Sequence, residues 1–339
     1  MTSSVLTASA LGLSRNESGR RFPHAEDAAA LEELRSGVIE ILTGGSWDQP
    51  WHVHDLEKMD AVEVDHLVER GLMTPAFADR TGEGRGFAVY GDGEASLEIN
   101  GEDHLRLLAY RRGGDLTALW SLLSRLDDGL ETVLSYAFDP QWGYLTARPH
   151  RAGSGMRAYA TLHLPALTLM GRLSETALEL AGQRFGLTPL WGGLGGIIQV
   201  SNLGPQGKPE TEILQQIGHI VRGVIEKERS VRKMLFRENP VQSRDQIGRA
   251  LGLLQQAWSM PFHESVNLIS AVEVGIDAGL VEAPGLGSEP TFGLMSRLQP
   301  AHVVVDYMDR RVGCLESPAV DEQRARLLRE LFAGAVIMS

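Results

Sequence analysis

The segment Asn100–Arg106, which reads Asn-Gly-Glu-Asp-His-Leu-Arg, places a carboxylate, an imidazole and a guanidinium close together in the chain. Such a set suits the transfer of a phosphoryl group or a proton, because arginine holds phosphoryl oxygens and a carboxylate can orient the attacking group. Charged residues on a strand can also simply face solvent. The segment alone leaves both interpretations open.

Two alternating runs, Phe87–Tyr90 and Ala95–Ile99, precede this segment and are separated by a turn that contains Asp92-Gly93. Asp-Gly between alternating runs is a strong signal for a β-hairpin. We therefore expect the charged residues to lie on the strand that follows the hairpin.

On such a strand Glu102, His104 and Arg106 share one face, whereas Asp103 and Leu105 take the other, because strand side chains alternate. One face is then polar and could line a cleft. The alternation predicts that the carboxylate and the guanidinium act on the same side of a sheet.

A second segment, Tyr144–Arg157, carries several arginines and a Gly-Ser-Gly turn. Glycine lets the backbone approach a ligand closely. We expect this turn to place Arg157 at the start of a helix that runs toward Leu173. His163 lies in an apolar run and is expected to be a core histidine with its hydrogen bonds satisfied.

Together the two segments resemble the signatures of guanidino kinases, Asn-Glu-Glu-Asp-His-Leu-Arg and Thr-x-Cys-Pro-Thr-Asn-x-Gly-Thr-Gly-x-Arg. The resemblance is closer to bacterial protein-arginine kinases (McsB type), which continue into Leu-His-Leu-Pro-Ala-Leu and Gln-Ile-Ser-Asn-Gln segments. These are matched here by Leu162–Leu167 and Gln199–Asn202. The resemblance extends from Leu13–Asn16 to Asp321–Glu330 and so covers nearly the whole chain.

This resemblance implies an α+β guanidino-kinase fold, an antiparallel sheet flanked by helices, with a helical C-terminal domain and Mg-ATP as cofactor. Glu102 matches the catalytic carboxylate, and Arg106 and Arg157 match two arginines that bind the phosphates of ATP. Arg15 matches the last arginine of the N-terminal pattern Ser-Ser-Arg-x-Arg-Leu-Ala-Arg-Asn. We include it among the expected cofactor-binding residues.

Other positions depart from the family pattern. Ala10 and Gly12 stand where two phosphate-binding arginines are expected, and Gly71 stands where a histidine is thought to pack on the nucleotide. Thr188–Gly196 is shorter than the family's Arg-Gly-x-x-Gly-Glu loop and carries no charge. Trp191 within it could fill the space that the missing loop leaves.

Arg148 and Arg151 replace the cysteine and asparagine of the second signature, so two positive charges are added near Arg157. A single transition-state arginine is worth about 10³ to 10⁵ in rate in related phosphoryl transfers. The losses therefore favour a pseudokinase with a binding or regulatory role. The alternative is an active protein-arginine kinase in which Arg148 and Arg151 replace the lost arginines. Small-guanidine phosphagen synthesis is disfavoured because the C-terminal region resembles the protein-directed branch.

The family also has a C-terminal phosphoarginine pocket built around Arg-Asp-x-x-Arg-Ala. This chain keeps Asp321 and Arg324 of that motif but has Val320 at the first position. A weakened pocket and a helix start capped by Asp321 both remain open. The resemblance further implies a homodimer and a protein partner, such as an active paralogue, a Clp-type chaperone or an arginine-containing protein.

The composition, with 339 residues and 44 acidic against 32 basic side chains, is that of a globular protein and argues against nucleic-acid or membrane partners. The single cysteine, Cys314, excludes a disulfide framework and a thiol-based zinc site and fits the cytoplasm. The Asn239-Pro240 step predicts a boundary between a phosphotransferase domain, 1–238, and a helical domain, 239–339. Periodicity predicts a strand through Trp142–Leu145 and helices at Glu26–Leu42, Asp60–Gly71, Leu116–Ser124, Glu210–Phe236, Ser243–Ser259, His263–Ala278 and Asp321–Ala333.

Overall fold

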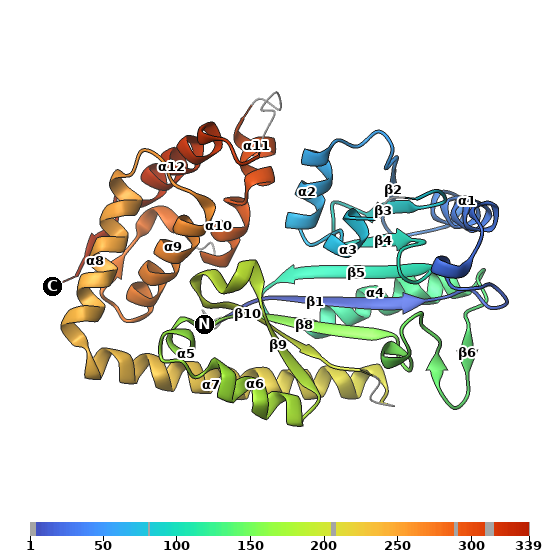
Figure 1. Ribbon diagram of the computed structural model, residues 1–339, viewed down its shortest axis with the longest axis horizontal. Helices are drawn as coiled ribbons and strands as arrows, with labels where there is room; N and C mark the ends of the chain where they lie inside the picture. The colour runs from blue at the N-terminus through green and yellow to red at the C-terminus, as the bar shows by residue number, and fades with distance from the viewer. Residues whose placement is uncertain (1–4, 81, 205–207, 288–290, 309–314, 339) are drawn as a thin grey trace. The chain divides into compact units, whose positions relative to one another are not determined.

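The computed structural model describes residues 5–80, 82–204, 208–287, 291–308 and 315–338 (Figure 1). The chain divides into two compact units. The first, here called the sheet unit, contains residues 8–159 and 201–218. The second, the helical unit, contains residues 1–7, 160–200 and 219–339.

An eight-stranded antiparallel sheet with the order β2-β3-β4-β5-β1-β8-β10-β9 confirms the expected fold class (Figure 1). The predicted hairpin is confirmed as β3 and β4. Strand β1 was not predicted, because its small residues hide the alternation that marks a strand. The strands are β1 (Leu6–Arg15), β2 (Trp51–His54), β3 (Gly86–Tyr90), β4 (Ala95–Ile99), β5 (Leu105–Arg112), β8 (Met156–His163), β9 (Phe185–Pro189) and β10 (Ile197–Asn202).

The expectation that Glu102 and His104 lie on a strand is wrong, because β5 begins only at Leu105. Asn100 has a φ of 54°, which turns the chain out of the β conformation before the next strand starts. His104 is buried, and its Nδ1 accepts a hydrogen bond of 3.1 Å from the backbone N–H of Glu17. Burial lowers the pKa of His104, so this imidazole is neutral and holds the fold.

The helix predicted from Arg157 is also wrong, because Met156–His163 forms strand β8. Alternate side chains in the first half of this strand are buried, which a two-residue period explains better than a helical one. Helix α5 (Pro165–Leu169) begins only after the strand, with proline in its first turn, where the missing N–H has no intrahelical partner to lose. Helix α6 (Leu173–Gly182) follows.

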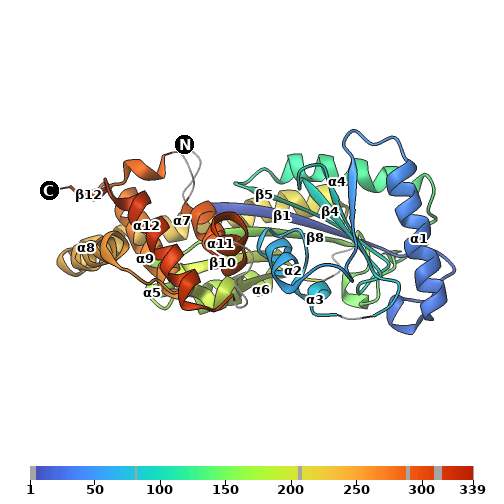
Figure 2. The same ribbon diagram turned by 90° about the horizontal axis from the view of Figure 1, so that it is seen from above.

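In the sheet unit, helices lie on both faces of the strands (Figure 2). Helix α4 (Leu116–Glu131) packs against β5 and buries the apolar stripe Leu119, Leu123, Leu126 and Leu130. It extends beyond its predicted end. The other elements of this unit are α1 (Ala28–Gly44), α2 (Ala61–Glu69), α3 (Pro75–Ala78), α4 (Leu116–Glu131), β6 (Phe138–Asp139), β7 (Gly143–Tyr144) and 3-10 turns at Pro23–Ala25 and Pro149–Arg151.

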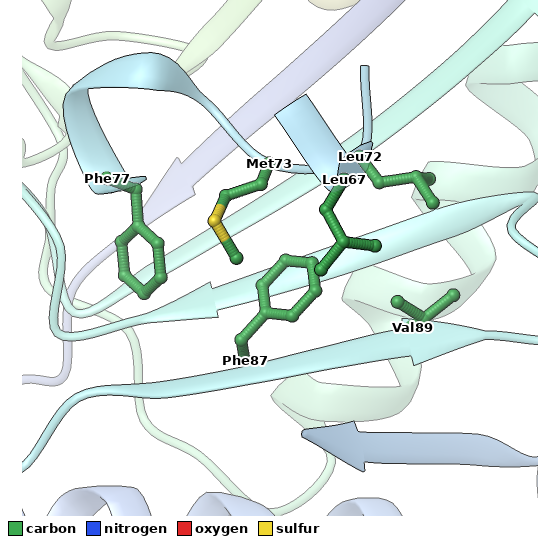
Figure 3. Close-up of a cluster of buried hydrophobic side chains, with 6 residues drawn as sticks. All are labelled: Leu67, Leu72, Met73, Phe77, Phe87 and Val89. Carbon is green, nitrogen blue, oxygen red and sulfur yellow. The ribbon is translucent and has the colours of Figure 1, made fainter. Parts of the chain in front are cut away.

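The face opposite α4 carries a compact apolar cluster in which α2 and α3 cover β3. Figure 3 shows Met73 and Phe77 directed at Phe87 of the strand. The buried members are Leu67, Leu72, Met73, Phe77, Phe87 and Val89. Burial of such side chains stabilises the fold by roughly 1.5 to 3 kcal/mol each. The cluster fixes the α2–α3 connection over the sheet face on which Arg106 also lies.

The helical unit confirms the predicted C-terminal helices, and it adds two short helices, α10 and α11, that periodicity did not reveal. Helix α8 packs against α9 and α12, and α11 packs against α12. The C-terminal helices are α8 (Pro240–Gln256), α9 (Phe262–Asp277), α10 (Thr291–Arg297), α11 (Pro300–Tyr307) and α12 (Pro318–Phe332), with strands β11 (Val281–Glu282) and β12 (Val336–Ile337) and 3-10 turns at Leu190–Gly196 and Pro284–Leu286.

Helix α7 (Glu210–Glu238) ends where the domain boundary was predicted, and α8 begins at Pro240. Helix α7 contains residues of both compact units, and the division into domains 1–238 and 239–339 stays a prediction. None of the helices in the described part of the chain combines the length with the hydropathy that a membrane-spanning segment requires.

Candidate active site

Both carboxylate oxygens of Glu102 are bound by arginines. Arg148 forms an ion pair with Oε1, and Arg151 forms an ion pair with Oε2. The side chains of Glu102 and Arg151 are 19% and 20% exposed, whereas that of Arg148 is 53% exposed. The structure thus brings three predicted site residues together and directs both arginines at the carboxylate.

Two sets of hydrogen bonds hold the loop that carries these arginines, one where its two ends meet and one at Ala147. Tyr144 and Gly153 exchange backbone hydrogen bonds of 2.8 and 3.2 Å. The buried Asp103, next to Glu102 in sequence, accepts hydrogen bonds from the backbone N–H of Ala147 at 2.7 Å and from Asn16 Nδ2 at 2.8 Å. These bonds join the loop to the connection between β4 and β5 that carries Glu102. The backbone on both sides of the Glu102–Arg148 and Glu102–Arg151 ion pairs is therefore held by hydrogen bonds.

Arg106 lies on β5, opposite Glu98 of β4 and Ser14 of β1. Glu98 is buried and accepts a 2.6 Å hydrogen bond from the backbone N–H of Thr74. Burial raises the pKa of Glu98, and the positive charge of Arg106 opposes that rise. Sequence reasoning missed Glu98. The feature of the sequence that could have revealed Glu98 is an acidic residue within the predicted strand Ala95–Ile99, whose other residues are uncharged.

Strand β1 presents small residues beside Arg106. Gly12 pairs with Leu108, and Ala10 pairs with Tyr110. A Cβ atom added at Gly12 would lie 3.3 Å from Leu108 Cδ2 and 3.7 Å from the Nε of Arg106. Positions 10 and 12 therefore point to the same face as Arg106 and carry no guanidinium.

The position expected to hold a nucleotide-packing histidine is occupied by Gly71 in a left-handed conformation, with φ of 72°. A Cβ atom here would lie 3.3 Å from Cδ2 of the Tyr110 ring. Burial raises the pKa of Tyr110 to about 12. The ring therefore packs against the glycine, and a side chain at position 71 would be strained as well as crowded.

Arg15, which we expected to bind the nucleotide, is 2% exposed and uses its donors inside the protein. Its Nε and Nη2 donate to Oδ2 of Asp127 on α4, at 3.1 and 2.6 Å, and its Nη1 donates to the carbonyl of Ser154 at 2.9 Å. The guanidinium carbon lies 3.6 Å from the centre of the Tyr144 ring. Arg15 therefore joins the α4 face of the sheet to the loop region, and its guanidinium is buried there instead of being exposed to a phosphate.

Arg157 lies on β8 with its guanidinium carbon 5.8 Å from the centre of the Tyr159 ring. Its Nε is buried without a hydrogen-bond partner among the described residues. The phosphate-binding role of Arg157 stays a prediction.

Comparison with known proteins places these features in a family. The family model for the catalytic domain of ATP:guanido phosphotransferases matches residues 35–231, and the model for the C-terminal domain of the protein-arginine kinase McsB matches residues 240–336. The chain belongs to the ATP:guanido phosphotransferase family. Within it, the curated relatives below place the chain among the protein-arginine kinases.

Two such relatives are the protein-arginine kinases of Halothermothrix orenii and Moorella thermoacetica. The first is 32% identical over 305 residues, which cover 88% of this chain and 86% of the relative. The second is 32% identical over 339 residues, which cover 97% and 94%.

Solved structures show the same fold. A lombricine kinase matches with a TM-score of 0.60 at 19% identity, over 68% of each chain. The duplicated taurocyamine kinase of Schistosoma mansoni matches with a TM-score of 0.61 at 18% identity, over 89% of this chain and 46% of that one. This chain therefore shares its fold with these two kinases although fewer than one residue in five is identical.

The loop that departs from the family pattern is folded onto the C-terminal helices. Trp191 has a φ of 49° and stacks on Phe292 with ring centres 5.6 Å apart, while Phe262 meets it edge-on at 5.4 Å. A Cβ atom at Gly195 would lie 3.0 Å from Val266 Cγ1. The loop is thus held by aromatic contacts and close backbone approach, with Trp191 packed among the rings.

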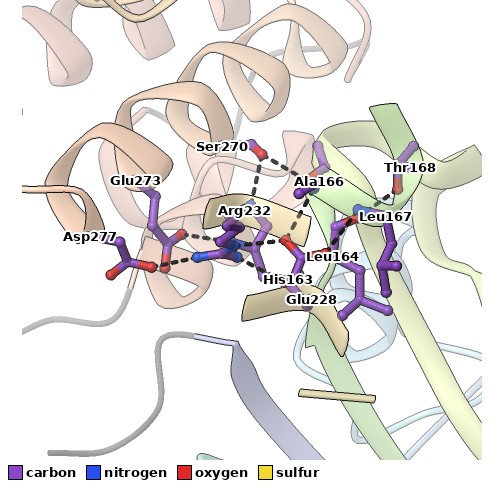
Figure 4. Close-up of polar contacts among 11 residues, drawn as sticks. His163, Leu164, Ala166, Leu167, Thr168, Glu228, Arg232, Ser270, Glu273 and Asp277 are labelled. Carbon is purple, nitrogen blue, oxygen red and sulfur yellow. Dashed lines mark hydrogen bonds and ion pairs between the residues drawn. The ribbon is translucent and has the colours of Figure 1, made fainter. Parts of the chain in front are cut away.

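A buried charge network fixes α5 to α7 and α9 in the helical unit (Figure 4). Glu228 is fully buried and accepts hydrogen bonds from the backbone N–H groups of Ala166 and Leu167, at 3.0 and 2.9 Å. Arg232 donates to Glu228 at 2.7 Å and pairs with Asp277. The negative charge of Glu228 is therefore balanced both by the free amides at the start of α5 and by a guanidinium.

His163 is confirmed as a core histidine with satisfied hydrogen bonds. Arg232 Nη2, which can only donate, lies 3.3 Å from its Nδ1, so the neutral ring carries its proton on Nε2. Nε2 then donates to Ser270 Oγ at 2.7 Å, and Ser270 donates to the carbonyl of Gly195 at 2.8 Å. Burial, followed by Arg232, lowers the pKa of His163 well below its usual range. This direction of donation prevents His163 from acting as a base toward Ser270.

The predicted phosphoarginine residues of the C-terminal motif are used inside the fold. Arg324 is 1% exposed and donates to the carbonyls of Leu298 and Met260, at 2.7 and 2.8 Å, as well as to Asp321. Helix α12 begins at Pro318 after Ser317, so Asp321 lies in the first turn and the expectation that it caps the helix is wrong. The pair has no exposed guanidinium to offer a phosphoryl group.

Proposed function

We propose that this chain is a protein-arginine-kinase homologue whose nucleotide site no longer supports efficient phosphoryl transfer, and that it works by binding protein partners. The observation that carries the proposal is the surroundings of Arg106. This guanidinium faces the buried carboxylate of Glu98 on one neighbouring strand, and Gly12 and Ser14 lie along the other.

The residues present fit Mg-ATP poorly. A triphosphate requires several cations around its oxygens, because phosphoryl transfer depends on electrostatic stabilisation. Positions 10 and 12 supply none, Glu98 repels an incoming anion, and the loop at Leu190–Gly196 is uncharged. We therefore assign no chemical step to ATP in this chain.

The second candidate is an active protein-arginine kinase in which Arg148 and Arg151 replace the lost arginines. It is favoured by the position of both guanidinium groups beside Glu102. It is also favoured by the closeness of Arg151 to Arg106, whose positive charge adds to the effect of burial in lowering the pKa of Arg151. It requires both arginines to leave Glu102, because that carboxylate would have to receive the substrate guanidinium. The contacts of the resting chain favour the first candidate.

The deciding experiment is calorimetric titration with Mg-ATP, together with transfer of radiolabelled phosphate to an arginine-rich protein. We expect a dissociation constant weaker than about 1 mM and no transfer. Glu98→Gln removes the repelling charge with little change of shape and should strengthen tripolyphosphate binding several-fold. Micromolar Mg-ATP binding with transfer that disappears in Glu102→Gln would instead establish the active kinase.

The partner that we propose first is an arginine-containing protein, and an active paralogue or a Clp-type chaperone are further candidates. We propose that the chain acts in the cytoplasm as a homodimer. The first of these partners is supported by the chemistry of Glu102, a carboxylate that pairs with guanidinium groups, and it requires Arg148 or Arg151 to leave that carboxylate. A pull-down with immobilised arginine-rich protein, compared between wild type and Glu102→Gln, tests this choice directly.

A further inference from the structure

We infer that a cavity within the helical unit is a binding site for a small, uncharged aromatic molecule that carries a hydroxyl group. The cavity has a volume of about 490 Å³ and is lined by α5, the Leu190–Gly196 turn, the end of α7, α8 and α9. All of its lining residues belong to the helical unit. The inference is independent of the proposed function, because it uses none of the residues around Glu102 or Arg106.

The volume of the cavity sets the size of its occupant. Small-molecule sites in proteins usually measure roughly 300 to 1,000 Å³, and a cavity of about 150 Å³ already admits benzene. At about 490 Å³, this cavity offers about three times the space that benzene needs. A molecule with two fused rings and a short substituent therefore fits inside it.

The wall of the cavity is mainly apolar. Helix α8 contributes Ile247, Ala250 and Leu253, which follow one another at three-residue spacing on one face of the helix. The Leu190–Gly196 turn contributes glycines, including Gly193 and Gly195, which have no side chains and expose a flat stretch of backbone. A flat wall together with apolar side chains suits the face of an aromatic ring, whose removal from water is favourable.

The charges around the cavity favour an uncharged occupant. No carboxylate, lysine or histidine is among the described residues that line it. Its one arginine, Arg249, is 77% exposed and already forms an ion pair of 2.8 Å with Asp245. A charged group inside the cavity would lose its hydration and gain no ionic partner, which is unfavourable.

Ser243 provides a polar group for the hydroxyl of the ligand. It lies in the first part of α8, lines the cavity and is 6% exposed. Its hydroxyl group has no hydrogen-bond partner among the described residues, which is unusual for a buried polar side chain. A hydroxyl group on the ligand can both donate and accept, so it can satisfy Ser243 whichever way the serine proton points.

Hydrogen bonds hold the walls in place before any ligand binds. The backbone N–H of Gly195 donates to Asn267 Oδ1 at 2.8 Å, and Ser270 Oγ donates to the carbonyl of Gly195 at 2.8 Å. Ser270 and Ala166, which both line the cavity, are drawn in Figure 4. Because the turn is already attached to α9, little ordering is needed for binding. An occupant should further protect the turn from local opening.

Calorimetric titration of the full chain with 2-naphthol and with naphthalene tests the inference. Wild type should bind 2-naphthol with a dissociation constant of about 10 to 100 µM and naphthalene at least about threefold more weakly, because only 2-naphthol can bond to Ser243. In Ser243→Ala the two affinities should become equal. Hydrogen exchange of the backbone amides in Leu190–Gly196 should slow when 2-naphthol is added.

A second variant, Ala271→Leu, places a larger side chain in the cavity from α9 and should weaken both compounds at least about tenfold. Ala177→Leu is the matched control, because Ala177 is a half-buried alanine of α6 that does not line the cavity, and both affinities should be unchanged. Absence of binding to wild type would overturn the inference, as would full affinity in Ala271→Leu. A preference for 2-naphthol that survives Ser243→Ala, or unchanged exchange in the turn, would also overturn it, because the ligand would then be bound elsewhere.

Discussion

Replacing Glu273 by glutamine should make the protein increasingly more stable than wild type as the pH rises. Glu273 lies on α9, is buried, and is surrounded by Asp277 on its own helix, Arg232 on α7 and His163 on β8, with Thr291 of α10 as a hydrogen-bond partner. Burial, followed by the charge of Asp277, raises the pKa of Glu273 to about 8.

The sign of the effect follows from this raised pKa. Between the ordinary pKa of 4.5 and about 8, Glu273 ionises in the unfolded chain but stays protonated in the native one. The unfolding free energy of wild type therefore falls as pH rises through this window, by about 1.4 kcal/mol per unit for this one group. Glutamine does not titrate, so the variant should gain roughly 3 to 4 kcal/mol on wild type between pH 5 and pH 8.

The assay is chemical denaturation of both proteins at several pH values from 5 to 9, with the difference in unfolding free energy plotted against pH. Titrating groups far from Glu273 cancel in this difference. A flat line would refute the reasoning, because it would mean that Glu273 has the same protonation in the native and unfolded states. A variant that loses stability as pH rises would show that the native carboxylate is ionised and paired.

Two further predictions concern residues that fix the site. Asp127→Asn leaves the buried Arg15 without its counter-ion and should cost about 3 to 5 kcal/mol of stability, measured by denaturant unfolding, whereas a loss below 1 kcal/mol would place that charge in solvent. Gly195→Ala adds a Cβ 3.0 Å from Val266 Cγ1 at a φ of 59° and should lower stability by about 1 to 3 kcal/mol. An unchanged melting temperature for this variant would mean that the loop adapts freely.

Local patterns in the sequence predicted the hairpin and the long helices, and they identified the family. Asp-Gly between two alternating runs fixed β3 and β4, because a two-residue period and a tight turn act over few residues. Strand β1 was not predicted, because its small residues resemble a loop. Strand β8 was mistaken for a helix, because it follows the glycine-rich turn at Gly153–Gly155. The C-terminal helices were predicted because an apolar face repeats along each of them.

The candidate site was only half determined in this way. The sequence by itself identified Glu102 and Arg106 as residues of a phosphotransferase motif and showed that positions 10, 12 and 71 lack the expected side chains. Only the tertiary structure decided that Glu98 faces Arg106, that Arg148 and Arg151 bind Glu102, and that Arg15 and Arg324 are buried within the fold. The physical reason is that a charge takes its partner from whichever distant segment the strand register and the packing bring near it, and no short-range pattern records that choice.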